Sequence, residues 1–348
     1  MSISVIGVII AILFFCLLII GHEFGHFIAA KRLGVKVLEF SMGMGPLLWH
    51  KQKGETQYSL RAIPIGGFCK LEGEDGDEDK ADMRSFANQP AWSKILILIM
   101  GSVMNVIMGI IILTIIFTSL GSTTTYVGEV SADSPAAAAG IQAEDRIVAI
   151  DGKEVRTWND VIDSTSAYDG NGSLQVILER KAEEGGKKQF PVELTPVYSE
   201  ENGRYLMGIT TKIIHSVPLS IKESLATCGD MVVSMKEFLV NLFKGRSSSD
   251  DVVGVVGIMA VVSEQAKTNG LINVIYLMGI ISFNLAIVNM LPFPALDGGR
   301  ILLVLLRRIT NDRIGDKAEA IVNAIGFILL MILMIFLLFK DTFKFIIK

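Results

Sequence analysis

The stretch Ile19-Ile20-Gly21-His22-Glu23-Phe24-Gly25-His26-Phe27 lies at the inner end of the first apolar run of the chain. On a helix, His22 and His26 project from one face, so both can ligate a single zinc ion. Glu23 lies beside them, within reach of a water molecule at such an ion. The spacing is typical of zinc hydrolases. The alternative is a set of polar side chains that cap a membrane helix, although ionisable groups inside membrane segments are usually functional.

The composition indicates a membrane protein with sizeable parts outside the bilayer. The chain has 348 residues, of which 51% are hydrophobic and 20% are charged, and its mean hydropathy is +0.50. It is too apolar for an ordinary soluble protein. The 20% of charged residues is compatible with a membrane protein if these residues are concentrated in the parts outside the bilayer. The net charge of −4 gives no indication of a nucleic-acid partner. The three cysteines are scattered, so neither a disulfide framework nor a cysteine zinc site is expected.

Four apolar segments are long enough to cross a bilayer, which takes about 20 helical residues. The expected segments are a first transmembrane helix within residues 1–33, a second at 94–121, a third, broken segment at 271–306 and a fourth at 319–340. Residues 1–5 include no basic residue, so the first run is interpreted as a retained helix and not as a signal peptide. Pro292 and Pro294 interrupt the third segment, and broken backbone at membrane depth is tolerated where it lines a wet cavity.

Basic residues determine the expected orientation in the cell membrane. Lys31 and Arg32 follow the first span, and further arginines surround the connection between the third and fourth spans. By the positive-inside rule, the N-terminus is outside and residues 31–93 and 307–318 are cytoplasmic. The segment that follows the second span is then expected on the extracytoplasmic side.

Between the first two spans, residues 34–93 are expected to form membrane-associated β-hairpins on the cytoplasmic side. Apolar and polar positions alternate along 37–46 and 58–68, and glycine and proline interrupt both runs. An edge near 42–45 or 65–68 could pair with an extended chain. A simple linker hairpin is the alternative. The acidic stretch 72–79 is expected to be a solvated loop.

Residues 122–200 change character and predict a small α+β domain. Strands are expected at 127–130, 145–153, 174–180 and 188–194, with helices at 134–140 and from Trp158. This order, with the run SPAAAAGIQAEDRIVAIDG at 134–152, resembles a PDZ domain, a module that takes up extended peptide by strand addition. A generic α+β domain is the alternative. Residues 201–270 are expected to form amphipathic linker helices.

A hydrolytic zinc ion needs about three protein ligands and an open position for water. His50 and His215 are available, but neither is at membrane depth, so both are interpreted as ordinary surface or interface histidines. Asp297 is the better candidate, because it is an acid on an apolar segment and the glycines that follow it permit close approach of the backbone. Taken alone, Asp297 could equally cap the following helix. Its pairing with the histidine motif predicts that it is the third ligand.

This pairing resembles the site-2 protease family of intramembrane zinc metalloproteases. In that family the metal is bound by the histidine pair and by the aspartate of an Asn-x-x-Pro-x-Pro-x-Leu-Asp-Gly motif, which matches residues 289–298 here. The similarity covers nearly the whole chain. It includes a Pro-x-x-x-Lys-Ile-Leu run that leads into the second span, and this run ends at Asn105. One departure is Met100-Gly101-Ser102, where relatives usually have Ala-Gly-Pro, and it concerns the packing of the second helix.

The resemblance implies a polytopic α-helical membrane protein of the cell membrane with an inserted extracytoplasmic PDZ domain. It implies a Zn²⁺ endopeptidase that cleaves transmembrane segments of single-span membrane proteins, such as anti-sigma factors already trimmed by an upstream site-1 protease. Glu23 would be the general base. Asn289 would contact substrate or stabilise the oxyanion, and the remaining candidates for binding substrate are Pro292, Pro294, Gly43, Gly45, Gly66 and Gly67.

Two other functions stay open from the residues alone. A zinc hydrolase that acts on a lipid or a small amide could use the same ligands, although the PDZ-like module argues against it. A membrane scaffold that presents a PDZ domain without catalysis is the second alternative. A scaffold has no need of Glu23 beside two histidines.

Overall fold

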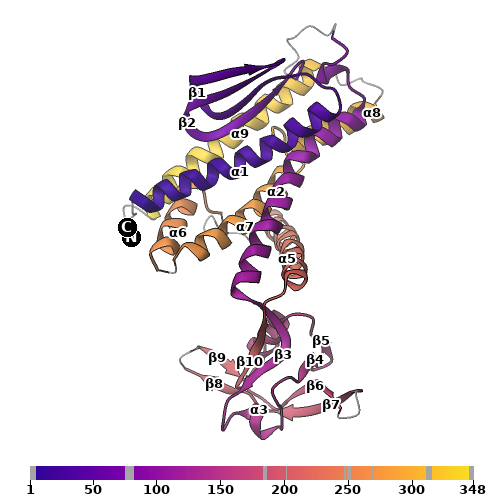
Figure 1. Ribbon diagram of the computed structural model, residues 1–348, viewed down its shortest axis with the longest axis vertical. Helices are drawn as coiled ribbons and strands as arrows, with labels where there is room; N and C mark the ends of the chain where they lie inside the picture. Colours follow the sequence, from indigo (N-terminus) through magenta and orange to yellow (C-terminus); the bar gives the residue numbers. More distant parts are fainter. Residues whose placement is uncertain are drawn as a thin grey trace. The chain divides into compact units, whose positions relative to one another are not determined.

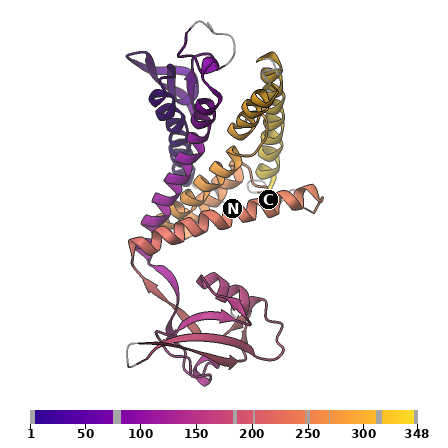
Figure 2. The same cartoon turned by 90° about the vertical axis from the view of Figure 1, so that its right-hand side faces the viewer.

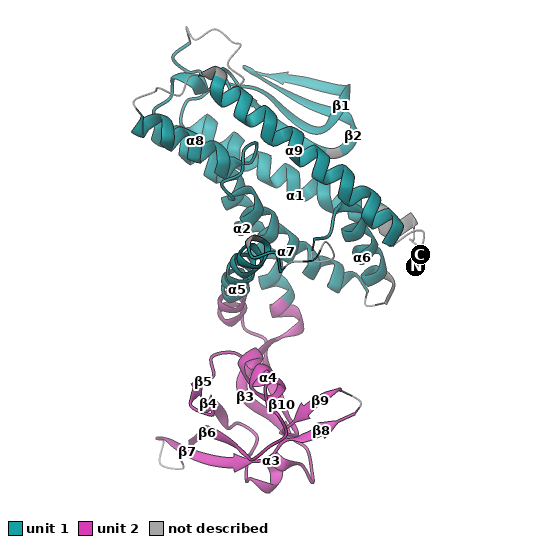
Figure 3. Cartoon of the chain, turned by 180° about the vertical axis from the view of Figure 1, so that it is seen from behind, with its two compact units in different colours: residues 1–116, 224–348 teal, residues 117–223 magenta. Residues whose placement is uncertain are grey.

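The computed structural model describes residues 5–74, 82–182, 186–200, 202–246, 248, 252–268, 270–310 and 316–344. The chain divides into two compact units, residues 1–116 with 224–348 and residues 117–223 (Figure 3). Most of the acidic stretch expected as a loop, from residue 75 onward, lies outside the described residues.

Unit 1 is built from long apolar helices (Figure 1). Among the described residues, four helices are long and apolar enough to cross a membrane. They are α1 (Val5–Arg32), α2 (Ala91–Leu120), α7 (Gly270–Asn289) and α9 (Asp316–Thr342), and they fall on the four expected segments. Large apolar side chains such as Ile325 and Phe336 remain exposed on α9. Such surfaces are expected where lipid surrounds the helix.

The structure divides the expected third segment, 271–306, into two helices. α7 ends at Asn289, and the separate helix α8 (Asp297–Ile309) has 13 residues, too few to span a bilayer. The helix has to end before Pro292 and Pro294, because proline cannot donate the backbone hydrogen bond that would continue it. The expected continuation of the third span toward residue 306 is therefore replaced by a turn and a short second helix.

Two further helices follow the first half of the chain. α5 (Val217–Phe243) is the first helix within residues 201–270, which were expected to form amphipathic linker helices. α6 (Val255–Thr268) is shorter than a membrane span and packs between α1 and α7 through a small core of Ala11, Val262 and Val274. These contacts hold α1 and α7 in fixed positions on either side of α6.

The hairpin region forms a sheet from two long strands, β1 (Val37–Lys53) and β2 (Thr56–Leu71). Their register shows that the pair folds back on itself, because Glu39 faces both Gln57 and Lys70. Each strand therefore contributes two segments. The order across the sheet is 67–71, 37–42, 57–60 and 47–53. Within the part of the chain that the structure describes, residues 67–71 of β2 therefore pair with a strand on one side only.

Glycines make the bends of this sheet. Gly43 and Gly45 in β1 and Gly66 in β2 have φ of 83°, 81° and 98°, in the left-handed region that glycine adopts without strain. At the β1–β2 turn, Glu55 Oε1 accepts hydrogen bonds from Arg84 Nη2 at 2.7 Å and from Lys31 Nζ at 2.8 Å. These two cations lower the pKa of Glu55 to about 2, which keeps the turn tied to the end of α1 at all but strongly acidic pH.

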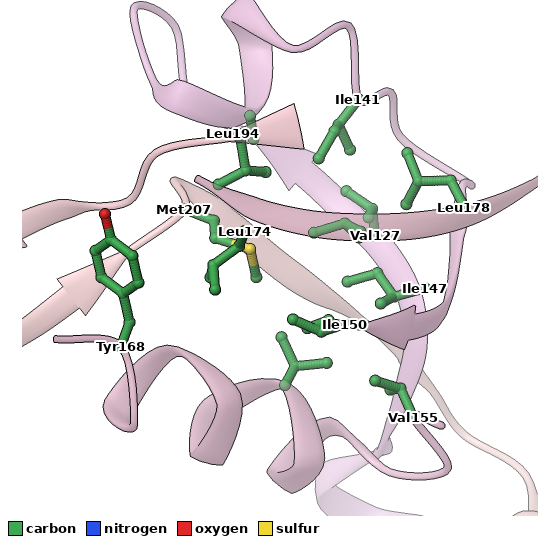
Figure 4. Packing of buried hydrophobic residues seen from close by; sticks show 13 residues of the cluster. Val127, Ile141, Ile147, Ile150, Val155, Tyr168, Leu174, Leu178, Leu194 and Met207 are labelled. Carbon is green, nitrogen blue, oxygen red and sulfur yellow. The ribbon is translucent and has the colours of Figure 1, made fainter. Parts of the chain in front are cut away.

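Unit 2 is a six-stranded sheet with two short helices (Figure 2). The strand order is β10-β3-β4-β6-β7, and β5 pairs with β4. The elements are β3 (Ser122–Val130), α3 (Pro135–Ala138), β4 (Arg146–Ile150), β5 (Lys153–Glu154), α4 (Trp158–Ser166), β6 (Leu174–Lys181), β7 (Lys187–Leu194) and β10 (Ile209–Ile214). Its core includes Val127, Ile147, Ile150 and Leu178 (Figure 4).

Unit 2 continues past the expected boundary at residue 200. The short pair β8 (Val197–Ser199) and β9 (Arg204–Leu206) follows β7, and β10 then pairs with β3. The expectation that linker helices begin at residue 201 is therefore corrected, because the first of them begins at Val217. Residues 209–214 are rich in β-branched isoleucine and threonine, which favour a strand.

Candidate active site

The structure brings together the three side chains that the sequence marks as metal ligands. His22 and His26 lie one turn apart on α1, and their Nε2 atoms are 3.2 Å apart. Asp297, the first residue of α8, places Oδ2 3.2 Å from His22 Nε2 and 3.4 Å from His26 Nε2. All three ligand atoms lie within 4.8 Å of one another.

The donor set fits a zinc ion. Asp297 Oδ2 is buried and accepts no well-directed hydrogen bond, although the two imidazole nitrogens are close. A buried carboxylate oxygen without a partner is costly unless a cation balances it. Two imidazoles and one carboxylate are also a common ligand set of catalytic zinc, which keeps a fourth position open.

The ring of His26 is held in the tautomer that metal binding needs. Its Nδ1 lies 2.9 Å from the carbonyl oxygen of Ile97 in α2. A carbonyl oxygen can only accept, so Nδ1 carries the proton and donates it. The lone pair of Nε2 is then directed toward Asp297 and is available to a metal.

Asn105 of α2 can do the same for His22 once its side-chain amide is turned over. Its side-chain amide lies 3.3 Å from His22 Nδ1, the residue is fully buried, and its Oδ1 has no partner as oriented. A half-turn of the amide exchanges its oxygen and nitrogen, so that Nδ1–H of His22 donates to Oδ1. The backbone carbonyl of Asn105 accepts from Ser282 Oγ at 2.8 Å, which ties the residue to α7.

Replacing Asn105 with leucine should weaken zinc binding by about 10- to 100-fold, because His22 loses the acceptor that fixes its tautomer. Zinc retention during dialysis against graded chelator measures this effect. Ser102→Ala is the matched control, since Ser102 Oγ is a buried hydroxyl of the same helix without a hydrogen-bond partner. Wild-type retention of zinc in Asn105→Leu would contradict this role of the amide.

Close approach of α2 to α1 requires glycine. A Cβ atom on Gly101 would lie 2.3 Å from His26 Nε2 and 2.7 Å from His22 Cε1. A Cβ atom on Gly25, which lies between the two histidines in sequence, would lie 2.1 Å from the carbonyl oxygen of Met100. The two helices therefore cross in contact at His22 and His26, where only a hydrogen atom fits in place of a side chain.

A tight turn between α7 and α8 positions Asp297 beside His22 and His26. A Cβ atom on Gly298 would lie 2.3 Å from Met290 O, and one on Gly299 would lie 2.0 Å from Phe293 O. The start of α8 thus packs directly on the backbone of the turn. Ala295 has φ of 73°, which is unusual for a residue with a side chain and marks local strain just before Asp297.

Glu23 is held by the hairpin sheet. Its Oε2 accepts a hydrogen bond from the backbone N–H of Cys69 in β2 at 3.0 Å. Glu23, the two histidines and Asp297 line one cavity of about 700 Å³. The carboxylate is thus fixed at the wall of a space large enough for a peptide segment and water.

Of the other residues predicted to bind substrate, some line this cavity and some do not. Asn289 lines it, with Nδ2 3.3 Å from His22 Nε2. Gly66 and Gly67 also line it. Gly43, Gly45, Pro292 and Pro294 are not among the residues that line it, and they shape the bends of β1 and the α7–α8 turn instead.

Cys69, which also lines the cavity, is not suited to be a nucleophile. Burial, and to a smaller extent the nearby carboxylates of Glu23 and Glu74, raise the pKa of its thiol. The thiol therefore stays protonated at neutral pH, whereas the thiolate is the nucleophilic form.

Sequence reasoning missed several residues of the site. Asn105 was noted only as the end of a family run, although a buried amide in an apolar helix is itself a signal. Gly101 carried no signal for contact with the histidines. Arg300 and Glu74, which also line the cavity and pair at 2.5 Å, are far apart in sequence and share no motif.

Comparisons with known proteins show the family of this chain. The family model described as peptidase family M50 matches residues 10–333. An inferred zinc metalloprotease of Clostridium acetobutylicum is 39% identical over 342 residues, which cover 97% of this chain and 98% of that protein. The regulator of sigma-W protease RasP of Bacillus subtilis is 26% identical over 96% of this chain and 97% of its own length.

Among solved structures, the PDZ domain of an SdrC-like protein from Listeria monocytogenes matches 26% of this chain and 87% of that chain, with 25% identity and a TM-score of 0.21. The family model and the relatives extend over nearly the whole chain, and the relatives are named as zinc metalloproteases. The chain belongs to peptidase family M50, the site-2 zinc metalloproteases.

Proposed function

We propose that His22, His26 and Asp297 hold the zinc ion of this protease. The observation that carries the proposal is the convergence of three ligand atoms within 4.8 Å, one of them a buried carboxylate oxygen without a hydrogen-bond partner. The hydrogen bonds of His26 to Ile97 and of His22 to Asn105 support it, because they leave both Nε2 atoms free to bind a metal.

The protein is a multi-pass membrane zinc metalloprotease of regulated intramembrane proteolysis. Zinc, when bound, supplies the Lewis acid that activates a water molecule and polarises the scissile carbonyl. Glu23 is the proposed general base: it accepts a proton from the attacking water and then gives it to the amide nitrogen that leaves. Its hydrogen bond with Cys69 engages one carboxylate oxygen and fixes the direction of the carboxylate.

The proposed place of the substrate is the outer edge of β2 near Gly67, on the side where no other strand among the described residues pairs with residues 67–71. A peptide bond inside a helix is protected by its hydrogen bonds, so the substrate has to unwind before cleavage. An unwound segment can pair with this edge, which borders the cavity beside Glu23. Asn289 is placed to donate a hydrogen bond to a carbonyl oxygen held near His22. The proposed edge, 67–71, overlaps the edge expected near 65–68 at Gly67 and Phe68 and does not include the one expected near 42–45.

The proposed substrates are single-span membrane proteins, anti-sigma factors among them, already trimmed by a site-1 protease. The name of the Bacillus subtilis relative, a regulator of sigma-W protease, supports this class. The two alternatives from the sequence, a scaffold and a hydrolase of lipids or small amides, lose support because the family is one of peptidases.

Unit 2 is proposed to be a PDZ domain on the extracytoplasmic side. Its order of strands and helices supports this, as do the Ser134 cap of α3 and the strand β4 within the quoted run. The proposed domain includes residues 122–200 and also β10, because β10 pairs with β3. The basic residues at the cytoplasmic ends of α1 and α8 support the orientation. The domain is proposed to act as a size filter or as a binder of freshly cut ends.

The test measures zinc and proteolysis in the full-length protein purified in detergent. We expect about one zinc ion per chain in the wild type, and loss of both zinc and cleavage of a single-span substrate in His22→Ala and Asp297→Asn. His50→Ala, an exposed histidine of β1, is the control and should keep both. Wild-type zinc content and cleavage in both ligand variants would refute the site.

A further inference from the structure

The unpaired edge of β2 ends in two hydrogen bonds to carboxylates. The backbone N–H of Cys69 donates to Glu23 Oε2 at 3.0 Å, and the N–H of Leu71 donates to Glu74 Oε2 at 3.2 Å. Alternate residues of an antiparallel strand direct their N–H groups to the same side. The N–H groups of Cys69 and Leu71 therefore lie on the same edge of β2, as does that of Gly67. At Leu71, the last of these positions, the N–H is bonded to Glu74.

Glu74 is itself fixed by α8. Its second oxygen, Oε1, accepts from Arg300 Nη1 at 2.5 Å, and both side chains are largely shielded from solvent. Arg300 lies in the first turn of α8, three residues after Asp297, and its guanidinium lies 5.9 Å from the centre of the Phe86 ring. One carboxylate thus links the end of the β2 edge to the helix that carries the proposed metal ligand.

We propose that the Glu74–Arg300 pair is a stop that closes the β2 edge at Leu71 and thereby sets which peptide bond of the substrate is cleaved. The inference rests on the proposed function, in which substrate pairs with this edge. An incoming strand can bond at Gly67, whereas the N–H of Cys69 is held by Glu23 and that of Leu71 by Glu74, which its ion pair with Arg300 keeps in place. The stop and Asp297 move together, since both are attached to the first turn of α8.

The alternation of a strand gives this stop a specific consequence. A strand that slips by one residue presents the wrong face, whereas a slip by two residues keeps the same face and the same pattern of hydrogen bonds. When the stop is removed, the N–H of Leu71, the next outward N–H beyond that of Cys69, becomes available to a substrate strand that extends two residues farther along the edge. The scissile bond should then move by two residues, which a general loosening of the fold would not produce.

The experiment maps the cleavage position by mass spectrometry, using the zinc-loaded full-length protein in detergent and a single-span substrate. In Glu74→Ala we expect the ratio of product cut two residues away to product cut at the original bond to rise about five- to tenfold, as for the loss of one hydrogen bond. Arg300→Gln should shift the same ratio in the same direction. Glu74→Gln keeps an acceptor for Leu71 and should shift it less than Glu74→Ala.

Arg307→Gln is the matched control. Arg307 lies on the same helix and pairs with Glu319 at 2.8 Å, with similar shielding from solvent, but neither residue lines the cavity. This variant should cut at the original bond only. A two-residue shift in Arg307→Gln as well, or a single unchanged cut in both Glu74→Ala and Arg300→Gln, would overturn the proposal.

Hydrogen exchange separates this inference from the proposed function. The amide of Leu71 should exchange faster in Glu74→Ala than in the wild type, and this readout needs no proteolysis. If the wild type cleaves no substrate, the proposed function fails, and exchange alone still tests the bond between Leu71 and Glu74. Unchanged exchange at Leu71 in Glu74→Ala would overturn the stop itself.

Discussion

Replacing Glu23 with glutamine should reduce cleavage of a membrane substrate by about 10²- to 10⁴-fold, while zinc stays bound. Glutamine has nearly the same shape, and its amide oxygen can still accept the N–H of Cys69 that Glu23 accepts at 3.0 Å. It cannot take up the proton of the attacking water. The cleavage rate and the zinc content of the same purified sample measure the two effects.

Glu39→Gln is the matched control for this variant. Glu39 is a largely shielded carboxylate of the same sheet that accepts hydrogen bonds from Ser59 and Arg61, but it does not line the cavity. This control should retain most of the activity. An unchanged cleavage rate in Glu23→Gln would rule out Glu23 as the general base, and loss of zinc would show that it supports the metal site instead.

Replacing Gly101 with alanine should abolish both zinc binding and cleavage, although the change adds a single methyl group. The new Cβ would lie 2.3 Å from His26 Nε2 and 2.7 Å from His22 Cε1, far inside van der Waals contact. To relieve the overlap, either α2 moves away or both rings rotate, and each change separates the three ligand atoms. Overpacking of this kind typically costs about 1–3 kcal/mol, but its effect here falls on the metal site directly.

Gly21→Ala tests whether any added methyl group between α1 and α2 has the same effect. Its Cβ would lie 2.3 Å from Met108 Sδ, but this atom belongs to a flexible side chain that can rotate away. We expect Gly21→Ala to keep its zinc and most of its activity. Full zinc occupancy in Gly101→Ala would show that α2 does not approach the histidines this closely.

The parts of the site that could be predicted are those that follow from the spacing of residues close together in the sequence. His22, Glu23 and His26 follow from the period of a helix, and zinc follows from their chemistry. Asp297 needed a second observation, an acid between prolines and glycines in an apolar segment. The prediction of the family and of zinc is confirmed by the family match and by the names of relatives. The roles of the individual residues stay predictions.

The parts that could not be predicted depend on contacts between distant segments. Gly101 and Asn105 matter because α2 crosses α1 at the histidines, and nothing in the sequence gives that crossing point. The strands of 34–93 were expected, but their folding into a four-segment sheet depends on pairing that only the register shows. For the same reason β10, which completes the sheet of unit 2 by pairing with β3, was mistaken for part of a linker.

The position of Asp297 near the far end of the chain has a consequence for biosynthesis. The histidines of α1 leave the ribosome first, and Asp297 follows only after unit 2, α5, α6 and α7 have been made. At synthesis rates of about 5–20 residues per second, this interval lasts roughly 14 to 54 seconds. Throughout that time the nascent chain has two of its three proposed ligands, so the protease should become active only after Asp297 has been made.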